Sequence, residues 1–116
     1  MPTRTKTLLL SMEPLSPGQE RFAELLSRPG LRIERIVSRQ ASSSADFWYD
    51  QDWDEWVAVL AGMGTLLFAD GDERITLQTG EAMLIPAHCR HRVERTDPDT
   101  ETVWLAIHFP PLVGEA

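Results

Sequence analysis

Between residues 55 and 109 the sequence alternates short apolar stretches with turn-forming residues at close spacing. Glycine, proline and aspartate separate these stretches, and several of them alternate apolar and polar residues. Short strands that follow one another in this way are typical of an antiparallel sandwich or barrel. The strands that we predict cover residues 31–39, 47–51, 55–61, 65–69, 75–77, 82–85, 90–94 and 102–109. The fold class expected from this pattern is all-β.

The residues before this region carry a different signal. Ser16 can cap a helix, Pro17 suits the first helical position, and Gln19 completes the spacing of a capping box. The apolar residues that follow recur at intervals of three and four, and a Pro-Gly pair ends the pattern. We therefore expect a short helix at 17–26 in front of the barrel.

Length and charge limit the class of protein. The chain has 116 residues and a net charge of −7, which argues against binding to nucleic acid or to an anionic membrane. Its single cysteine, Cys89, fits a reducing compartment, and no apolar stretch is long enough to span a bilayer. We expect one cytoplasmic domain over 1–116, with an arm and helix at 1–30 and a barrel at 31–110.

One stretch near the middle of the strand region has a distinctive spacing. It contains Gly80, then five residues, Pro86, one residue, His88, two residues and His91. This order resembles the second motif of the cupin family, small metal-binding β-barrels, except that His88 stands where that motif usually has glycine. The resemblance implies a double-stranded β-helix, or jelly roll, and places His91 in its pocket.

A second stretch resembles the first cupin motif, so that the two motifs and the strands between them cover residues 47–109. Six residues separate Glu55 from Gly62, as in that motif, but both of its histidines are absent. In one register their places fall on Tyr49 and Gln51, and in the other on Trp48 and Asp50. We prefer the first, because alternation along a strand would then aim both side chains at one face with Glu55.

The resemblance implies a pocket lined by Tyr49, Gln51, Glu55 and His91. Glu55 and His91 would be the catalytic residues and the first metal ligands, with Gln51 and His88 completing the shell around Zn, Fe, Mn or Ni. The other interpretation is a metal-free pocket in which Glu55 accepts hydrogen bonds from Tyr49 or His91. Both interpretations place the same side chains together.

Two further residues have open roles. Arg95 could share the strand face of His91 and bind a substrate carboxylate, together with Tyr49 and Gln51, although a surface ion pair is the simpler interpretation. His108 alternates with apolar residues in a strand, which favours a hydrogen-bonded structural histidine over a ligand.

The function that these features favour is small-molecule binding by a cupin with a divalent-metal pocket, acting as a lyase, isomerase or dioxygenase on a small metabolite. The alternative is a ligand-binding or sensor module without catalysis, which the missing first-motif histidines favour. A third class, a partner-binding protein, would use Trp53 and the acidic turn around it. Because barrels of this size leave edge strands and apolar outer faces, we also expect a homodimer.

Overall fold

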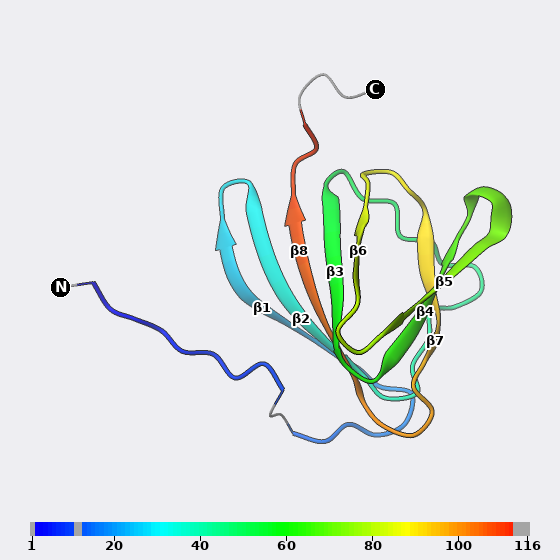
Figure 1. Cartoon of the computed structure of the whole chain (residues 1–116), viewed down its shortest axis with the longest axis horizontal. Coiled ribbons are helices and arrows are strands. Elements are labelled where there is room, and N and C mark those ends of the chain that lie inside the picture. Colours follow the sequence, from blue (N-terminus) through cyan, green and yellow to red (C-terminus); the bar gives the residue numbers. More distant parts are fainter. Residues whose placement is uncertain (1, 11–12, 113–116) are drawn as a thin grey trace.

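Two antiparallel β-sheets make up the body of the protein in a computed structural model that describes residues 2–10 and 13–112. The five-stranded sheet has the order β1-β2-β8-β3-β6, and the three-stranded sheet has the order β5-β4-β7. Figure 1 shows the two sheets meeting at an angle around one interior. The elements are β1 (Glu20–Arg28), β2 (Leu31–Ser38), β3 (Asp54–Ala61), β4 (Met63–Phe68), the short 3-10 helix η1 (Asp70–Asp72), β5 (Glu73–Gln78), β6 (Ala82–Ile85), β7 (His91–Thr96) and β8 (Thr102–Phe109).

The all-β, jelly-roll prediction is confirmed. The main core lies between the two sheets because alternate residues of each strand face inward. Its buried members come from both sheets: Val57, Val59, Leu66, Phe68, Leu77, Ile85 and Trp104. Part of this apolar layer also lines a cavity that carries polar side chains.

The predicted helix at 17–26 is wrong, because these residues lead into β1 and pair with β2. The capping-box contact does form, since the Ser16 N–H donates to Oε1 of Gln19 at 2.9 Å, but it closes a turn. The helical spacing has a local cause: the pairing with β2 shifts between Glu24 and Leu26, which leaves Leu25 as an extra residue. Such a bulge breaks the alternation that marks a strand. No helix in the described residues is long and apolar enough to cross a membrane.

The N-terminal arm lies outside the body. Its Leu15 is buried against Val37 and Val103 on the outer face of the five-stranded sheet. Residues 2–10 extend away from the strands in Figure 1, and the Arg35 guanidinium holds the arm there by donating to the Leu8 carbonyl. The arm therefore covers only part of that outer face.

Candidate functional site

A cavity opens between the inner face of the five-stranded sheet and strands β4 and β7. Its floor is the apolar core, where Val57, Leu66 and Trp104 contribute to the lining. Its polar side chains come from both sheets and from the 47–51 segment: Glu20, Glu34, Tyr49, Gln51, Glu55, His91 and His108. All four residues that the motif resemblance placed around one pocket are among them.

His91 presents one ring nitrogen to this cavity. Its Nδ1 lies 2.9 Å from the carbonyl oxygen of Cys89, and because a carbonyl can only accept, Nδ1 carries the proton. Nε2 is therefore an acceptor, and no described residue lies within hydrogen-bond distance of it. The side chain is only 6% exposed, and burial lowers its pKa, opposed by the hydrogen bond to Cys89. His91 is thus a neutral imidazole with a free lone pair facing the cavity.

Glu55 faces His91 from β3. Its Oε1 lies 3.7 Å from Nε2 of His91, and its side chain is 10% exposed. Burial and the nearby Glu34 carboxylate raise the pKa of Glu55 to about 7, against the opposing effects of Arg32 and of a hydrogen bond from Gln51. At neutral pH this carboxyl group is therefore close to half protonated, which suits a group that gives and takes protons.

Tyr49 and Gln51 reach the cavity from a segment that is not a regular strand. Tyr49 makes an isolated bridge to β7, with its N–H donating to the His91 carbonyl at 2.7 Å and the return bond at 3.2 Å. The Tyr49 and His91 rings stack with their centroids 5.3 Å apart. Both Tyr49 and Gln51 line the cavity. Asp50 does not, and its carboxylate lies beside the His88 ring, with Oδ1 2.7 Å from Nδ1. Tyr49 and Gln51 are the two residues of the preferred motif register, and the predicted strand at 47–51 is reduced to this bridge.

His88 does not join the other predicted metal ligands. Its backbone has φ +61, a left-handed conformation in which glycine is favoured, and this matches the place where the second motif usually has glycine. The ring is 63% exposed and lies beside two aspartates, with Nδ1 at 2.7 Å from Asp50 and Nε2 at 3.5 Å from Asp52. The Asp50 carboxylate raises the pKa of His88. His88 belongs to the outer surface of the turn before β7.

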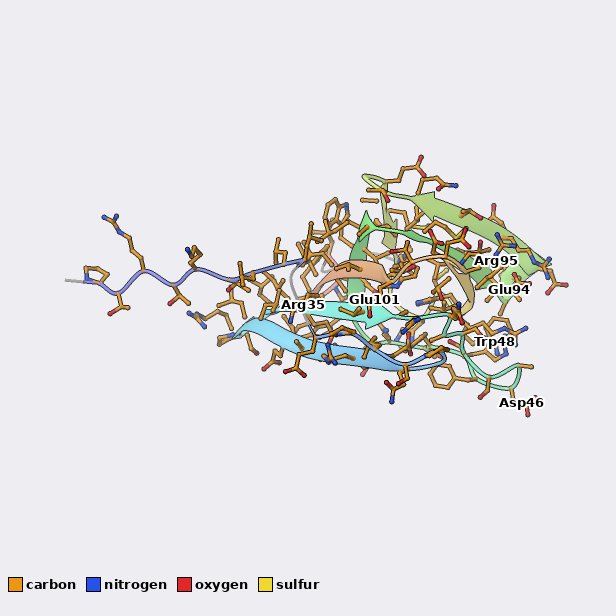
Figure 2. The ribbon with its side chains drawn as sticks, turned by 90° about the horizontal axis from the view of Figure 1, so that it is seen from below. Arg35, Asp46, Trp48, Glu94, Arg95 and Glu101 are labelled. Atoms are coloured by element: carbon orange, nitrogen blue, oxygen red, sulfur yellow. The ribbon has the colours of Figure 1, made fainter. Side chains whose placement is uncertain are left out.

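Arg95 also lies away from the cavity, so the interpretation in which it shares the strand face of His91 is wrong. On β7, Val93 and Arg95 pair with consecutive residues of β4, so Glu94 is an extra residue in a bulge. The bulge turns the Arg95 side chain off the inner face, and Arg95 is exposed. In Figure 2, Arg95 and Glu94 lie at the end of the molecule farthest from the N-terminal arm.

Three polar lining residues were not predicted as site residues: Glu20 on β1, Glu34 on β2 and His108 on β8. Nε2 of His108 lies 3.1 Å from Oε1 of Glu34, so the prediction of a hydrogen-bonded strand histidine is confirmed. Burial and Arg32 lower the pKa of His108, while the Glu34 carboxylate opposes this. The only sequence signal for these residues was their alternation with apolar neighbours, and this does not reveal which strands pair.

The cavity offers a small donor set for a metal. Of the predicted metal ligands, Glu55, His91 and Gln51 line the cavity; Glu55 and His91 are strong donors, and the Gln51 side chain adds a neutral oxygen. Among residues 2–10 and 13–112, no group of three or more His, Cys, Asp or Glu side chains is placed to hold an ion. Since catalytic zinc sites use three protein ligands, these residues fit a resident divalent metal poorly.

Comparison with known proteins gives relatives of this chain. L-ectoine synthase from Rhodococcus erythropolis is 35% identical over 75 residues, which are 65% of this chain and 54% of that protein. L-ectoine synthase from Rhodococcus jostii is 36% identical over the same length. The chain thus spans about half the length of these curated relatives.

Solved structures resemble the whole body of the protein. A crystal structure from Ralstonia eutropha, described as a candidate mannose-6-phosphate isomerase, is 39% identical with a TM-score of 0.87, covering 93% of this chain and 100% of that one. A cupin superfamily protein from Desulfitobacterium hafniense is 19% identical with a TM-score of 0.73 and covers 94% of both chains, which shows the fold alone. The cupin domain family itself matches residues 37–108. Because this match spans more than half of the chain, the protein belongs to the cupin family.

Proposed function

We propose that the protein binds a small metabolite in the cavity between the sheets and that Glu55 and His91 exchange protons with it. The observation that supports this proposal most is the pair itself: a carboxyl group with a pKa of about 7 beside an imidazole nitrogen that is free to accept. Such pairs serve general acid–base catalysis in lyases and isomerases. The relatives described as a synthase and an isomerase favour an enzyme over the alternative, a sensor module that binds the same ligand without turnover.

The chemistry follows from the protonation states of the two side chains. Nε2 of His91 takes a proton from the bound metabolite, and the Nδ1–H bond to the Cys89 carbonyl stabilises the resulting cation. The protonated form of Glu55 gives its proton to a second atom of the metabolite. Delivery to carbon completes an isomerisation, and delivery to a departing hydroxyl group completes an elimination of water. Proton transfer from His91 to Glu55, 3.7 Å apart, restores the starting state.

A divalent metal is not needed for these steps. If one binds, Glu55, His91 and Gln51 are the residues that would hold it, and it would polarise an oxygen of the metabolite. The predicted metal-assisted lyase, isomerase and dioxygenase therefore remain alternatives of the same site, without His88 and Arg95.

The test uses a thermal-shift screen of small acids, sugars, phenols and amines, followed by proton exchange of each binding compound in D₂O, measured by NMR. We expect binding that weakens in Glu55→Gln and His91→Asn but not in His88→Gln, whose side chain lies outside the cavity. Exchange that these two variants abolish supports catalysis, and binding without exchange supports the sensor. Equal binding by all three variants and the wild type would contradict the assignment of the cavity.

We also propose that two copies of the chain associate through the outer face of the five-stranded sheet. Trp56 on β3 and Leu84 on β6 are cross-strand neighbours on this face, with 40% and 49% of their surfaces exposed. Exposed apolar neighbours of this size are typical of interfaces. Trp53, which the partner-binding interpretation would use, is half-buried.

A further inference from the structure

The lining of the cavity is unbalanced in charge. Three of its side chains are carboxylic acids, Glu20, Glu34 and Glu55, and in the described part of the chain no lysine or arginine belongs to the lining. Burial and, after it, these three carboxylates raise the pKa of the Tyr49 phenol. Negative potential therefore converges on the space beside Tyr49.

Two of the carboxylates are fixed in place at the β1–β2 side of the cavity. Glu34 is held by His108 at 3.1 Å. Glu20 accepts a hydrogen bond at 2.8 Å from the hydroxyl of Ser38, a residue that is completely buried. Fixed carboxylates lose little conformational entropy when a ligand binds, which favours recognition by charge.

An aromatic ring lies between these carboxylates. Phe22 lines the cavity but is 53% exposed, because it faces inward where the smaller sheet does not cover β1. It lies opposite Ile36 on β2, with Glu20 two residues before it on the same face and Glu34 diagonally across. An exposed aromatic face with carboxylates on both sides is a favourable environment for an organic cation.

The His91 ring supplies a separate reason to expect a donor from the ligand. Its side chain is only 6% exposed, it lines the cavity, and its Nε2 accepts from no described residue. A ligand that carries N–H or O–H groups would provide the missing hydrogen bond. The carboxylates favour a positively charged group, and this nitrogen favours a hydrogen-bond donor elsewhere on the same ligand.

We propose that the ligand of this cavity carries a positively charged nitrogen, held between Glu34 and Glu20 over the face of Phe22, with its reacting part beside Glu55 and His91. This inference rests on the proposed function, because it names the class of metabolite for the same site. It reverses the prediction of a carboxylate-bearing substrate, which depended on Arg95. A carboxylate ligand would meet three acidic side chains and no basic one in the lining.

Three probes of similar size and different charge test the inference: butylamine, 1-butanol and butyrate. Binding to the full chain is measured at pH 7 and low salt by calorimetry and by NMR shifts of Tyr49. We expect butylamine, which is a cation at this pH, to bind at least about tenfold more tightly than the other two. Glu34→Gln and Phe22→Leu should each weaken butylamine about fivefold or more, whereas Glu73→Gln, an exposed residue outside the cavity, should not.

The outcomes separate this inference from the proposed function. Butanol or butyrate that binds beside Tyr49 as tightly as butylamine would overturn the cationic ligand and leave the acid–base site standing. Equal weakening of butylamine by Glu34→Gln and Glu73→Gln would mean a long-range effect of net charge and would also overturn it. Absence of binding by all three probes counts against the cationic ligand, while the D₂O exchange experiment still decides the proposed function.

Discussion

Oε1 of Glu55 and Nε2 of His91 face each other across 3.7 Å, which is too far for a hydrogen bond. Burial raises the pKa of the Glu55 carboxyl and lowers the pKa of the His91 imidazole. The backbone fixes both residues, since Glu55 on β3 pairs with β8 and with β6, and His91 begins β7. A ligand oxygen or nitrogen placed between them could bond to both.

The raised pKa of Glu55 predicts a specific pH dependence of stability. In the unfolded chain this carboxyl group ionises near 4.5, and in the folded protein it ionises near 7. Because ionisation is harder in the folded state, the stability that the neutral carboxyl supports is complete below pH 4.5 and is lost as the pH rises through 7. The shift corresponds to about 3 kcal/mol of unfolding free energy.

The measurement compares Glu55→Gln with the wild type by chemical denaturation at pH 4.5, 6, 7 and 8.5. We expect the variant to gain about 3 kcal/mol relative to the wild type across this range, with most of the gain between pH 5 and 7.5. Glu73→Gln, which changes the same charge at an exposed position, is the control and should run parallel to the wild type. If the stability of Glu55→Gln ran parallel to that of the wild type across this pH range, the Glu55 carboxyl would have an ordinary pKa.

Metal binding is tested by elemental analysis of protein purified without added ions. Among the described residues no three His, Cys, Asp or Glu side chains are grouped to hold an ion, so we expect less than one tightly held Zn, Fe, Mn or Ni ion per chain. Weak binding of added zinc should disappear in Glu55→Ala and His91→Ala. It should persist in His88→Ala, since His88 lies with Asp50 and Asp52. A stoichiometric metal that survives dialysis would contradict the conclusion that these residues fit a resident divalent metal poorly.

The later strands were predictable because their local signals agree with the fold. Strands β6 and β8 begin and end where the alternation of apolar residues predicts, and the turns between strands carry the expected glycine, proline and aspartate. Strand β1 was missed because the extra residue Leu25 breaks the alternation, and only pairing with β2 makes this segment a strand. Local pattern cannot detect a strand that depends on its neighbour.

Some residues of the site were likewise predictable from local sequence, and others depend on strand pairing. Tyr49, Gln51, Glu55 and His91 were predictable because the motif spacing fixes them relative to one another. Glu34 and His108 are 74 residues apart and meet only because β2 pairs with β8, which no spacing in the sequence indicates. Arg95 was misplaced because a bulge at one residue reverses the side of the strand on which its side chain lies.

Close packing under the cavity gives a prediction about its floor. A Cβ atom added at Gly64 on β4 would lie 2.2 Å from Cη2 of Trp104, whose side chain is buried and lines the cavity. Gly64→Ala must therefore displace the indole, and we expect a loss of about 2 kcal/mol or more in the unfolding free energy. Near-ultraviolet circular dichroism would report the displaced ring. Gly71→Ala, where the backbone has φ +79 but the space is open, is the control and should cost about 1 kcal/mol with no change in the Trp104 signal.

The proposed association of two copies predicts a dimer at micromolar concentration, measured by size-exclusion chromatography with light scattering. Trp56 on β3 pairs with Leu84 on β6 and with Ile107 on β8, so one substitution changes the centre of the exposed apolar face. Burial of an unpaired charge in an interface is costly, and we therefore expect Trp56→Lys and Leu84→Lys to shift the equilibrium to the monomer. Leu112→Lys, which adds the same charge at an exposed leucine beyond β8, should leave the dimer intact. A monomeric wild type would contradict the association, and a dimer unaffected by Trp56→Lys and Leu84→Lys would place the contact on another face.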